Sequence, residues 1–202
     1  MKRGMRVSIR SLIKIVSYKM TQSSFGYGKG TCDDWFTPSS ALLQIEPFIP
    51  PGSIIWECFM PTELPDSIVE SASTLRSMGY TVVTTRGDFF KNDGYGTDIV
   101  VSNPPYHTPS KQRNIKERVI ERLCELGKPF MLLLPTYYLQ TLSFKKLQNK
   151  YGRFGVVMPS KKINFYKVHA ESKTKAAKAK GCSFYTVWLC HKVILPKSFM
   201  VV

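Results

Sequence analysis

The sequence has few acidic residues. It contains 14 Asp and Glu against 29 Lys and Arg, which gives a formal net charge of +15 at pH 7 over 202 residues. A surplus of this size repels itself unless a polyanion binds, so nucleic acid is the first partner to consider and an acidic membrane surface is the second. The sequence also lacks an apolar run of about 20 residues, which a membrane-spanning helix requires. We therefore expect a soluble protein that binds nucleic acid and no membrane.

Closely paired cysteines are missing too. The five cysteines form no Cys-x-x-Cys pair, and the three histidines are scattered. Because zinc ligands usually occur in close pairs, the sequence predicts no metal site. No secretory signal is recognisable, which favours reduced thiols and an intracellular location, cytoplasmic or nuclear.

The N-terminal stretch has no acid at all before Asp33. Residues 1–32 contain seven Lys or Arg, and the basic and apolar residues fall on different faces of a helical pattern. This pattern is typical of a mitochondrial transit peptide over residues 1–20, and equally of a nucleic-acid-binding arm. In a third interpretation the natural chain starts at Met20. We expect residues 1–32 to be a flexible basic extension and residues 33–202 to form one folded domain.

Short apolar runs alternate with helical patterns through the middle of the chain. The runs predict buried strands at 53–58, 80–85, 98–102 and 129–135. One-sided apolar periodicity predicts helices at 65–78 and 114–126. This alternation is typical of an α/β fold with an open, mostly parallel sheet and helices on both faces.

The C-terminal part has a different pattern. Two further strands are predicted at 153–158 and 184–191, antiparallel to some of the others. Between them, residues 167–181 contain five lysines, one Glu and few apolar side chains. A segment of this composition cannot bury enough apolar surface to pack, so we predict a mobile, Lys-rich loop.

Three segments lie at the carboxyl ends of the first three predicted strands. They are Glu-Cys-Phe at 57–59, Gly-Asp-Phe-Phe at 87–90 and Asn-Pro-Pro-Tyr at 103–106. In an open parallel sheet, ligands bind at the carboxyl ends of the strands, near the point where the strand order reverses. We therefore expect the three segments to converge on one site.

The Asn-Pro-Pro-Tyr segment has the groups needed to bind an amino group. Two prolines make a stiff, extended turn without N–H donors, so the side-chain amide oxygen of Asn103 and the carbonyl of Pro104 can both accept from one NH2 group. Such bonds direct the nitrogen lone pair out of an aromatic ring and toward an incoming methyl group. Tyr106 offers a flat face for a base removed from its stack. Asn103 is no strong base, so the rate must come from orientation, and the proton is lost to water.

This segment resembles the catalytic motif of class I S-adenosylmethionine-dependent amino-methyltransferases that act on adenine N6. The resemblance implies a Rossmann-like fold with an antiparallel C-terminal strand, a catalytic domain over residues 33–202 and S-adenosylmethionine as cofactor. It also implies that Asn103, Pro104, Pro105 and Tyr106 are catalytic, with Asn103 close to the cofactor as well.

Three weaker similarities extend the resemblance over residues 33–135. Thr37 and Pro38 resemble a motif that touches the methionine end of the cofactor. Residues 55–59 stand where the first cofactor motif of the family stands, which implies contacts from Glu57, Cys58 and Phe59. Asp88 and Phe89 are similar to an Asp-Phe step in which the acid accepts from the adenine amine of the cofactor and the ring packs on it.

Two features depart from the family. Residues 58–64 contain no glycine, although the first cofactor motif normally continues into a Gly-rich turn. An acid expected after the second strand is replaced by Thr84, Thr85 and Arg86.

The region after the fourth predicted strand offers candidates for substrate binding. In the family an aromatic residue there covers the second face of the target base, a role open to Phe165 or Tyr166. The alternative is that both are core or sheet aromatics. We expect Lys161, Lys162 and Arg153 to lie on one edge with the Lys-rich loop and to contact phosphates.

The sequence thus predicts transfer of a methyl group to adenine N6 in nucleic acid, with DNA slightly favoured over RNA and a protein partner as one source of target specificity. Two alternatives stay open. One is methylation of a protein glutamine amide at N5, which uses a similar motif. The other is a non-catalytic, basic nucleic-acid-binding protein that keeps the fold.

Overall fold

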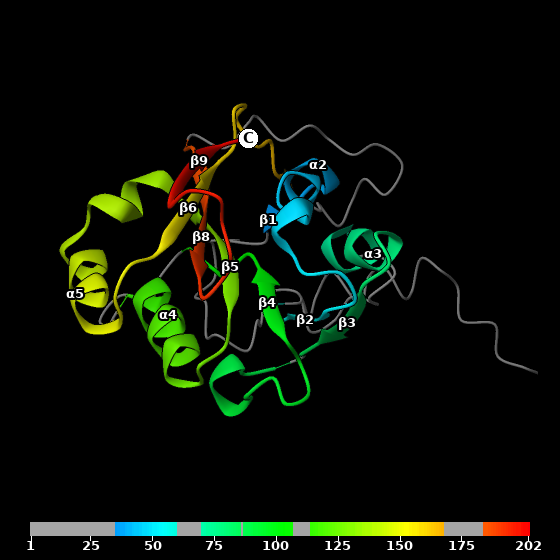
Figure 1. Ribbon diagram of the computed structural model, residues 1–202, viewed down its shortest axis with the longest axis horizontal. Coiled ribbons are helices and arrows are strands. Elements are labelled where there is room, and N and C mark those ends of the chain that lie inside the picture. Colours follow the sequence, from blue (N-terminus) through cyan, green and yellow to red (C-terminus); the bar gives the residue numbers. More distant parts are fainter. Residues whose placement is uncertain (1–34, 60–69, 86, 107–113, 168–183) are drawn as a thin grey trace, which may run out of the picture.

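The computed structural model of the chain describes residues 35–59, 70–85, 87–106, 114–167 and 184–202. Seven strands in these ranges form one sheet with the order β3-β2-β4-β5-β8-β6-β9 (Figure 1). They are β2 (Ile54–Glu57), β3 (Thr81–Thr84), β4 (Ile99–Ser102), β5 (Phe130–Pro135), β6 (Gly155–Met158), β8 (Thr186–His191) and β9 (Phe199–Val201). The fold predicted from the sequence, an α/β fold with a mostly parallel sheet, is confirmed.

The direction of the strands follows the prediction. β2 is parallel to β3 and β4, β4 is parallel to β5, and β6 is parallel to β9. Only β8 runs against its neighbours β5 and β6 within this sheet. The strand order reverses between β2 and β4, because the chain runs outward from β2 to β3 and then returns to the other side of β2.

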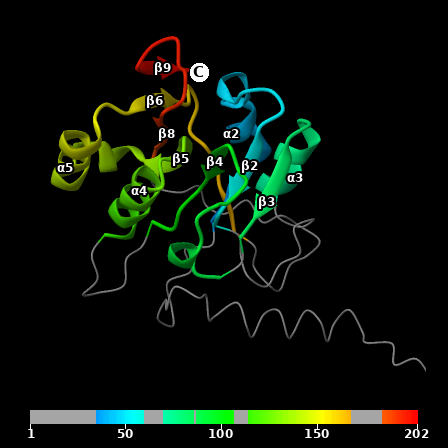
Figure 2. The same cartoon turned by 60° about the horizontal axis from the view of Figure 1, so that its bottom comes forward.

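Helices cover both faces of the sheet (Figures 1 and 2). α2 (Ser39–Leu43) and α3 (Glu70–Ser77) lie on one face, and α4 (Ile115–Glu125) and α5 (Leu142–Tyr151) lie on the other. β5 contributes side chains to the hydrophobic cores on both faces of the sheet, because successive side chains of a strand point to opposite faces. Met131 and Leu133 join the cluster under α2 and α3, whereas Leu132 and Leu134 join the cluster under α4 and α5.

Three 3-10 helices connect these elements: η1 (Glu46–Phe48), η2 (Phe89–Lys91) and η3 (Thr136–Gln140). A small second sheet pairs β1 (Trp35–Phe36) with β7 (Tyr166–Lys167) in antiparallel register. This pairing corrects one boundary, since Lys167 was expected in the mobile loop and instead belongs to a strand. The rest of that loop, residues 168–181, lies outside the described residues, as do residues 1–32.

Local backbone and side-chain features mark two helix ends. Asn114 caps α4 by accepting a hydrogen bond from the backbone N–H of Lys116, 3.1 Å away. Gly79 has a φ of +92° after α3, in the region that glycine adopts most readily. The start predicted for the helix at 65–78 lies outside the described residues up to residue 69.

Gly94 supports the sheet from the loop before β4. Its φ is +64°, and a Cβ there would overlap the indole ring of Trp56, which is fully buried in β2. Gly96 has a φ of +72°, but a Cβ there would have no neighbour within 4 Å. Both glycines have a positive φ, but a side chain would meet a steric overlap only at Gly94. A comparison of the two positions therefore separates the cost of backbone strain from the cost of overlap.

We predict that Gly94→Ala lowers the free energy of unfolding by about 2 kcal/mol more than Gly96→Ala does, because only the first adds overpacking against Trp56 to the cost of a positive φ. Urea denaturation of the two variants measures the difference. An equal loss of stability in both would contradict the predicted overlap.

Candidate functional site

Three predicted segments leave the sheet at one edge. In the parallel register Glu57 pairs with Thr84, and Trp56 pairs with Val100, so β2, β3 and β4 end side by side. The segment 57–59 begins at the last residue of β2, the segment 87–90 begins shortly after β3, and the segment 103–106 follows β4 directly. The expected convergence is therefore present in the backbone.

Glu57 connects two of these strand ends. Its side chain is 4% exposed, and its Oε1 accepts hydrogen bonds from the hydroxyl of Ser102 and from the backbone N–H of Phe59, the latter at 3.4 Å. The side chain of Ser71, in the first turn of α3, also forms a hydrogen bond to it. Burial raises the pKa of Glu57 from its ordinary value of 4.5 to about 7, and the three hydrogen bonds act in the opposite direction. The carboxyl group thus fixes the ends of β2 and β4 and the start of α3.

The Thr-Pro motif is connected to the same network. Thr37 is buried, and Pro38 is the N-cap of α2. The next backbone N–H, of Ser39, donates to Glu70 Oε1 at 2.9 Å. Glu70 precedes Ser71, which bonds Glu57, so a short polar chain links the Thr-Pro motif to the end of β2.

Cys58 is a buried thiol at this edge, with 2% of its surface exposed. Burial raises its pKa well above the ordinary value, and the negative charge of Glu57 raises it further. A thiol held in its neutral form is a poor nucleophile, so Cys58 has a structural part in the site.

Four aromatic rings form the wall of the site beside Cys58. The ring centroid of Phe89 lies 4.9 Å from that of Phe59, 5.1 Å from that of Phe90 and 5.7 Å from that of Trp56. Phe89 is fully buried, whereas Phe59 and Phe90 are half-buried. The prediction that Phe89 packs on a ligand is therefore corrected, because its ring is enclosed by the other three. Phe59 and Phe90 are the rings of this wall that reach the surface, and the guanidinium carbon of Arg118 lies over the Phe90 ring, 4.2 Å from its centroid.

Asp88 is half-buried at the start of η2. One of its carboxylate oxygens, Oδ1, accepts from the backbone N–H of Phe90 at 3.0 Å, which caps η2. The side chain is thus held against the backbone of Phe90. Thr85 stands where the family has an acid, and its hydroxyl oxygen lies 2.6 Å from Trp56 Nε1, from which it accepts a hydrogen bond.

The Asn-Pro-Pro-Tyr segment is held from two sides. The hydroxyl of Tyr106 donates to the carbonyl of Leu133 in β5 at 3.0 Å, and Lys116 Nζ donates to the carbonyl of Tyr106 at 2.5 Å. The amide oxygen of Asn103 is buried, and Pro104 is buried as well. The segment therefore has a defined position at the carboxyl end of β4.

Lys116 is a residue that the sequence reasoning missed. It is 5% exposed, although it is charged, and it comes from the first turn of α4. A signal was present in the sequence, because Lys116 occupies the apolar helix face together with Val119, Ile120 and Leu123. A lysine on an apolar face needs a partner, and here the partner is the backbone of the motif.

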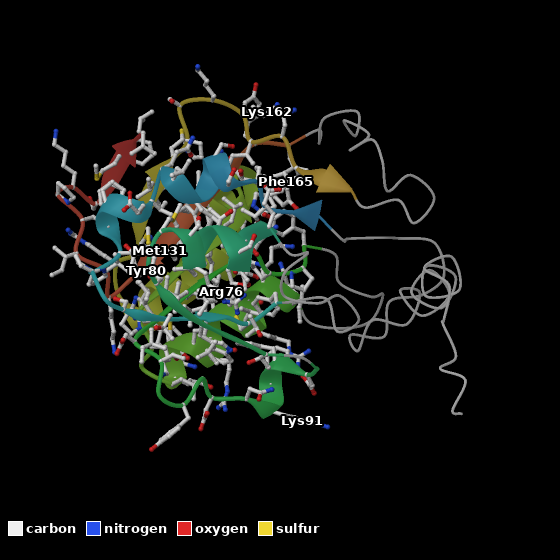
Figure 3. All side chains as sticks on the ribbon, turned by 90° about the vertical axis from the view of Figure 1, so that its right-hand side faces the viewer. Arg76, Tyr80, Lys91, Met131, Lys162 and Phe165 are labelled. Carbon is white, nitrogen blue, oxygen red and sulfur yellow. The ribbon has the colours of Figure 1, made fainter. Side chains whose placement is uncertain are left out.

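The aromatic residues proposed to cover a target base are placed differently from the expectation. Phe165 is 2% exposed and belongs to the core, so it cannot stack on a base in this arrangement (Figure 3). Phe184 lies next to it, with ring centroids 6.2 Å apart, and meets Tyr106 edge-on at 5.5 Å. Phe184 is therefore the aromatic neighbour of the motif. Tyr166 pairs through its backbone with Phe36 in β1.

The predicted basic residues divide between the two ends of β6. Lys161 and Lys162 follow its carboxyl end and line a cavity of about 480 Å³ next to Phe184. Arg153 precedes its amino end, next to Phe154, which packs on His191 at 5.0 Å. The expectation that all three lie on one edge is wrong for Arg153, because the length of β6 separates it from the two lysines.

Neither a metal site nor a membrane span is found in the described part of the chain. No three His, Cys, Asp or Glu side chains in those ranges are grouped so that they could hold an ion. Of the helices in the same ranges, none has the length and apolar character needed to cross a bilayer.

Comparison with known proteins supports the fold. No protein-family profile and no curated protein matches the sequence. A Listeria monocytogenes structure, provisionally named as a class I S-adenosylmethionine-dependent methyltransferase, superposes with a TM-score of 0.53 at 12% identity, over 98% of this chain and 73% of that one. A Pyrococcus horikoshii structure, provisionally named as an RNA methyltransferase, gives a TM-score of 0.46 at 15% identity, over 91% of this chain and 97% of that one. The chain has the Rossmann-like class I methyltransferase fold that the sequence predicted.

The buried carboxyl of Glu57 leads to a prediction about pH. Its pKa is about 7 in the folded protein and near 4.5 when exposed. As pH rises from 4.5 to 7, the unfolded chain loses this proton before the folded chain does. The contribution of Glu57 to the free energy of unfolding is therefore largest below pH 4.5. It falls by about 3 kcal/mol between pH 4.5 and 7 and stays constant above pH 7. We expect Glu57→Gln to remove this slope.

Urea denaturation at a series of pH values between 5 and 8 measures the effect. Glu46→Gln is the matched control, since Glu46 is exposed in η1, and this variant should keep the slope of the parent. A Glu57→Gln protein whose stability falls with pH as steeply as the parent would contradict the assignment.

Proposed function

We propose that the protein transfers a methyl group from S-adenosylmethionine to the N6 amine of adenine in nucleic acid, with DNA slightly favoured over RNA. The observation that carries the proposal is the position of Asn103-Pro104-Pro105-Tyr106. This segment follows the central strand β4 at the carboxyl edge of a class I methyltransferase fold. The edge is the place where such sheets bind ligands.

S-adenosylmethionine is the expected cofactor, because the Listeria protein with this fold is named as dependent on it. The residues beside β2 and β3 fit its adenosine half. The carboxylate of Asp88 can accept from an amine, and the half-buried rings of Phe59 and Phe90 offer apolar surface on the same wall, with Arg118 lying over the Phe90 ring. Thr37 and the backbone of Glu57 belong to the two segments that the polar chain from Ser39 to the Glu57 side chain joins, and they would hold the methionine half. When bound, the cofactor supplies an electrophilic methyl group.

The chain's own contribution is to hold the acceptor. Asn103 Oδ1, which is buried in this structure, and the carbonyl of Pro104 would accept hydrogen bonds from the two N–H groups of the exocyclic amine, and these bonds would turn the nitrogen lone pair out of the ring plane. With the cofactor bound, its methyl group would pass to that nitrogen, the bond from sulfur to the methyl carbon would break, and one proton would leave to water. Lys116 and the Leu133 carbonyl hold Tyr106 in place, so its ring is a prepared surface for the base.

The charge of the protein favours nucleic acid over a protein amide as substrate. A net charge of +15 attracts a polyanion over a long range, and two lysines flank the cavity next to the motif. A neutral glutamine side chain is not attracted by this charge in the same way. Among the acceptors that the motif could bind, the charge therefore favours nucleic acid.

Labelled S-adenosylmethionine tests the proposal directly. We expect label to enter adenine-containing single-stranded DNA or RNA and to be recovered as N6-methyladenine. We expect Asn103→Ala to reduce the rate by 100-fold or more, on the order seen when one group aimed at a transition state is removed. Asn149→Ala is the matched control, because Asn149 is exposed on α5, and it should keep the activity.

Other outcomes would replace the proposal. Label in a protein extract but not in nucleic acid would support glutamine methylation. Failure to bind the cofactor, together with retained binding of nucleic acid, would support the non-catalytic alternative.

A further inference from the structure

A cavity lies beside the Asn-Pro-Pro-Tyr motif and is not used by the proposed transfer step. It has a volume of about 480 Å³, within the usual range for small-ligand sites. Its walls come from η3, from the residues that follow β6 and from the segment that leads into β8. All three segments lie at the same edge as the motif, since Pro135 at the carboxyl end of β5 pairs with Thr186 at the start of β8.

We propose that this cavity binds the nucleotide next to the acceptor adenine and that binding there requires the nucleic acid to be single-stranded. The inference rests on the proposed function, because it takes the acceptor base to lie on Tyr106. It adds a second binding position with its own residues, namely Tyr137, Tyr185, Lys161 and Lys162.

Phe184 connects the two positions. Its ring lines the cavity and also meets the ring of Tyr106 edge-on, with centroids 5.5 Å apart. A base on Tyr106 and a base in the cavity would therefore be neighbours separated by one aromatic ring. Such an arrangement suits successive nucleotides of one strand whose bases have been drawn apart.

The cavity has exposed aromatic surface. The exposed fraction is 53% for Tyr137 and 66% for Tyr185, although large aromatic side chains of folded proteins are usually well buried. Aromatic rings at the surface of a basic protein are typical stacking platforms for unpaired bases. A base in a duplex has both faces covered by its neighbours, so this platform selects single strands.

The cavity is also positively charged. Lys161 and Lys162 are exposed at its rim, and Lys162 Nζ lies 5.4 Å from the centre of the Tyr185 ring. None of the described residues that line the cavity is acidic. The two lysines are therefore positioned to contact the phosphates that flank a base stacked on Tyr185.

The test uses oligonucleotides without adenine, 12-residue oligo-dT and oligo-U, so that binding is measured apart from methyl transfer. Fluorescence anisotropy follows binding to the full chain over a series of salt concentrations. We expect Tyr137→Ala with Tyr185→Ala to weaken binding at least tenfold, in the range expected for lost base stacking, with an unchanged salt slope. Tyr185→Phe keeps the ring and should bind like the parent. Tyr95→Ala is the matched control, because Tyr95 is 92% exposed and lies outside the cavity.

Replacing the lysines should change the salt dependence of binding, which the tyrosine variants leave unchanged. Lys161→Ala with Lys162→Ala should make the negative slope of log binding constant against log salt shallower by about 1.4, the value for two phosphate contacts on a single strand. Lys91→Ala with Lys197→Ala removes the same charge from exposed positions away from the cavity, and Figure 3 shows Lys91 far from Lys162. This control should leave most of the slope in place.

The outcomes separate the two proposals. Stacking-dependent binding of oligo-dT or oligo-U that disappears with the tyrosine variants supports the subsite, even if no methyl group is transferred to any nucleic acid. Equal binding by the parent and the tyrosine variants overturns the subsite, even if adenine is methylated. Displacement of the oligonucleotide by polyglutamate with equal strength in parent and tyrosine variants would also overturn it, since the cavity would then bind charge alone.

Discussion

The hydrogen bond between Glu57 and Ser102 is the contact on which the geometry of the site depends. It joins the last residues of β2 and β4, between which the strand order reverses. The same carboxyl group receives Ser71 from α3 and the backbone of Phe59. A buried acid is costly unless its hydrogen-bonding capacity is used or it is protonated. Three hydrogen bonds use that capacity, and burial raises the pKa of Glu57 to about 7, so the carboxyl group at this edge is protonated below that pH and ionised above it.

The residues at this edge of the sheet lie on two sides of β4. On the side of β2 and β3 lie Asp88 and the half-buried rings of Phe59 and Phe90, which we propose contact the adenosine half of the cofactor. On the side of β5, β8 and β6, Tyr106 leads through Phe184 to a basic, aromatic cavity suited to a polynucleotide. The Asn-Pro-Pro-Tyr segment lies between the two sides, where an acceptor amine would face a methyl donor.

Much of this arrangement could be predicted from the sequence because its causes are local. The apolar runs became β2, β3, β4 and β5. Asn114 marks the start of α4 through a local side-chain hydrogen bond, and Gly79 marks the end of α3 through its positive φ, and neither needs a tertiary context. α5 was missed because its sequence is mostly polar and only Phe144 and Leu147 are buried. Its formation depends on packing against α4, which periodicity does not reveal.

The errors within the site also have a tertiary origin. Phe89 and Phe165 have the residue types of ligand contacts, but the rings packed around them decide that they are core residues. Arg153 and Lys161 are close in sequence, yet the strand between them places them at opposite edges. Lys116 could have been found, since a lysine on the apolar face of a predicted helix is itself unusual.

The central claim is that this edge binds S-adenosylmethionine although residues 58–64 contain no glycine. Isothermal titration with S-adenosylhomocysteine, the demethylated product, tests it most directly because no acceptor is needed. The account predicts saturable binding of one molecule per chain with a dissociation constant below about 1 mM. The absence of saturable binding up to that concentration would contradict it.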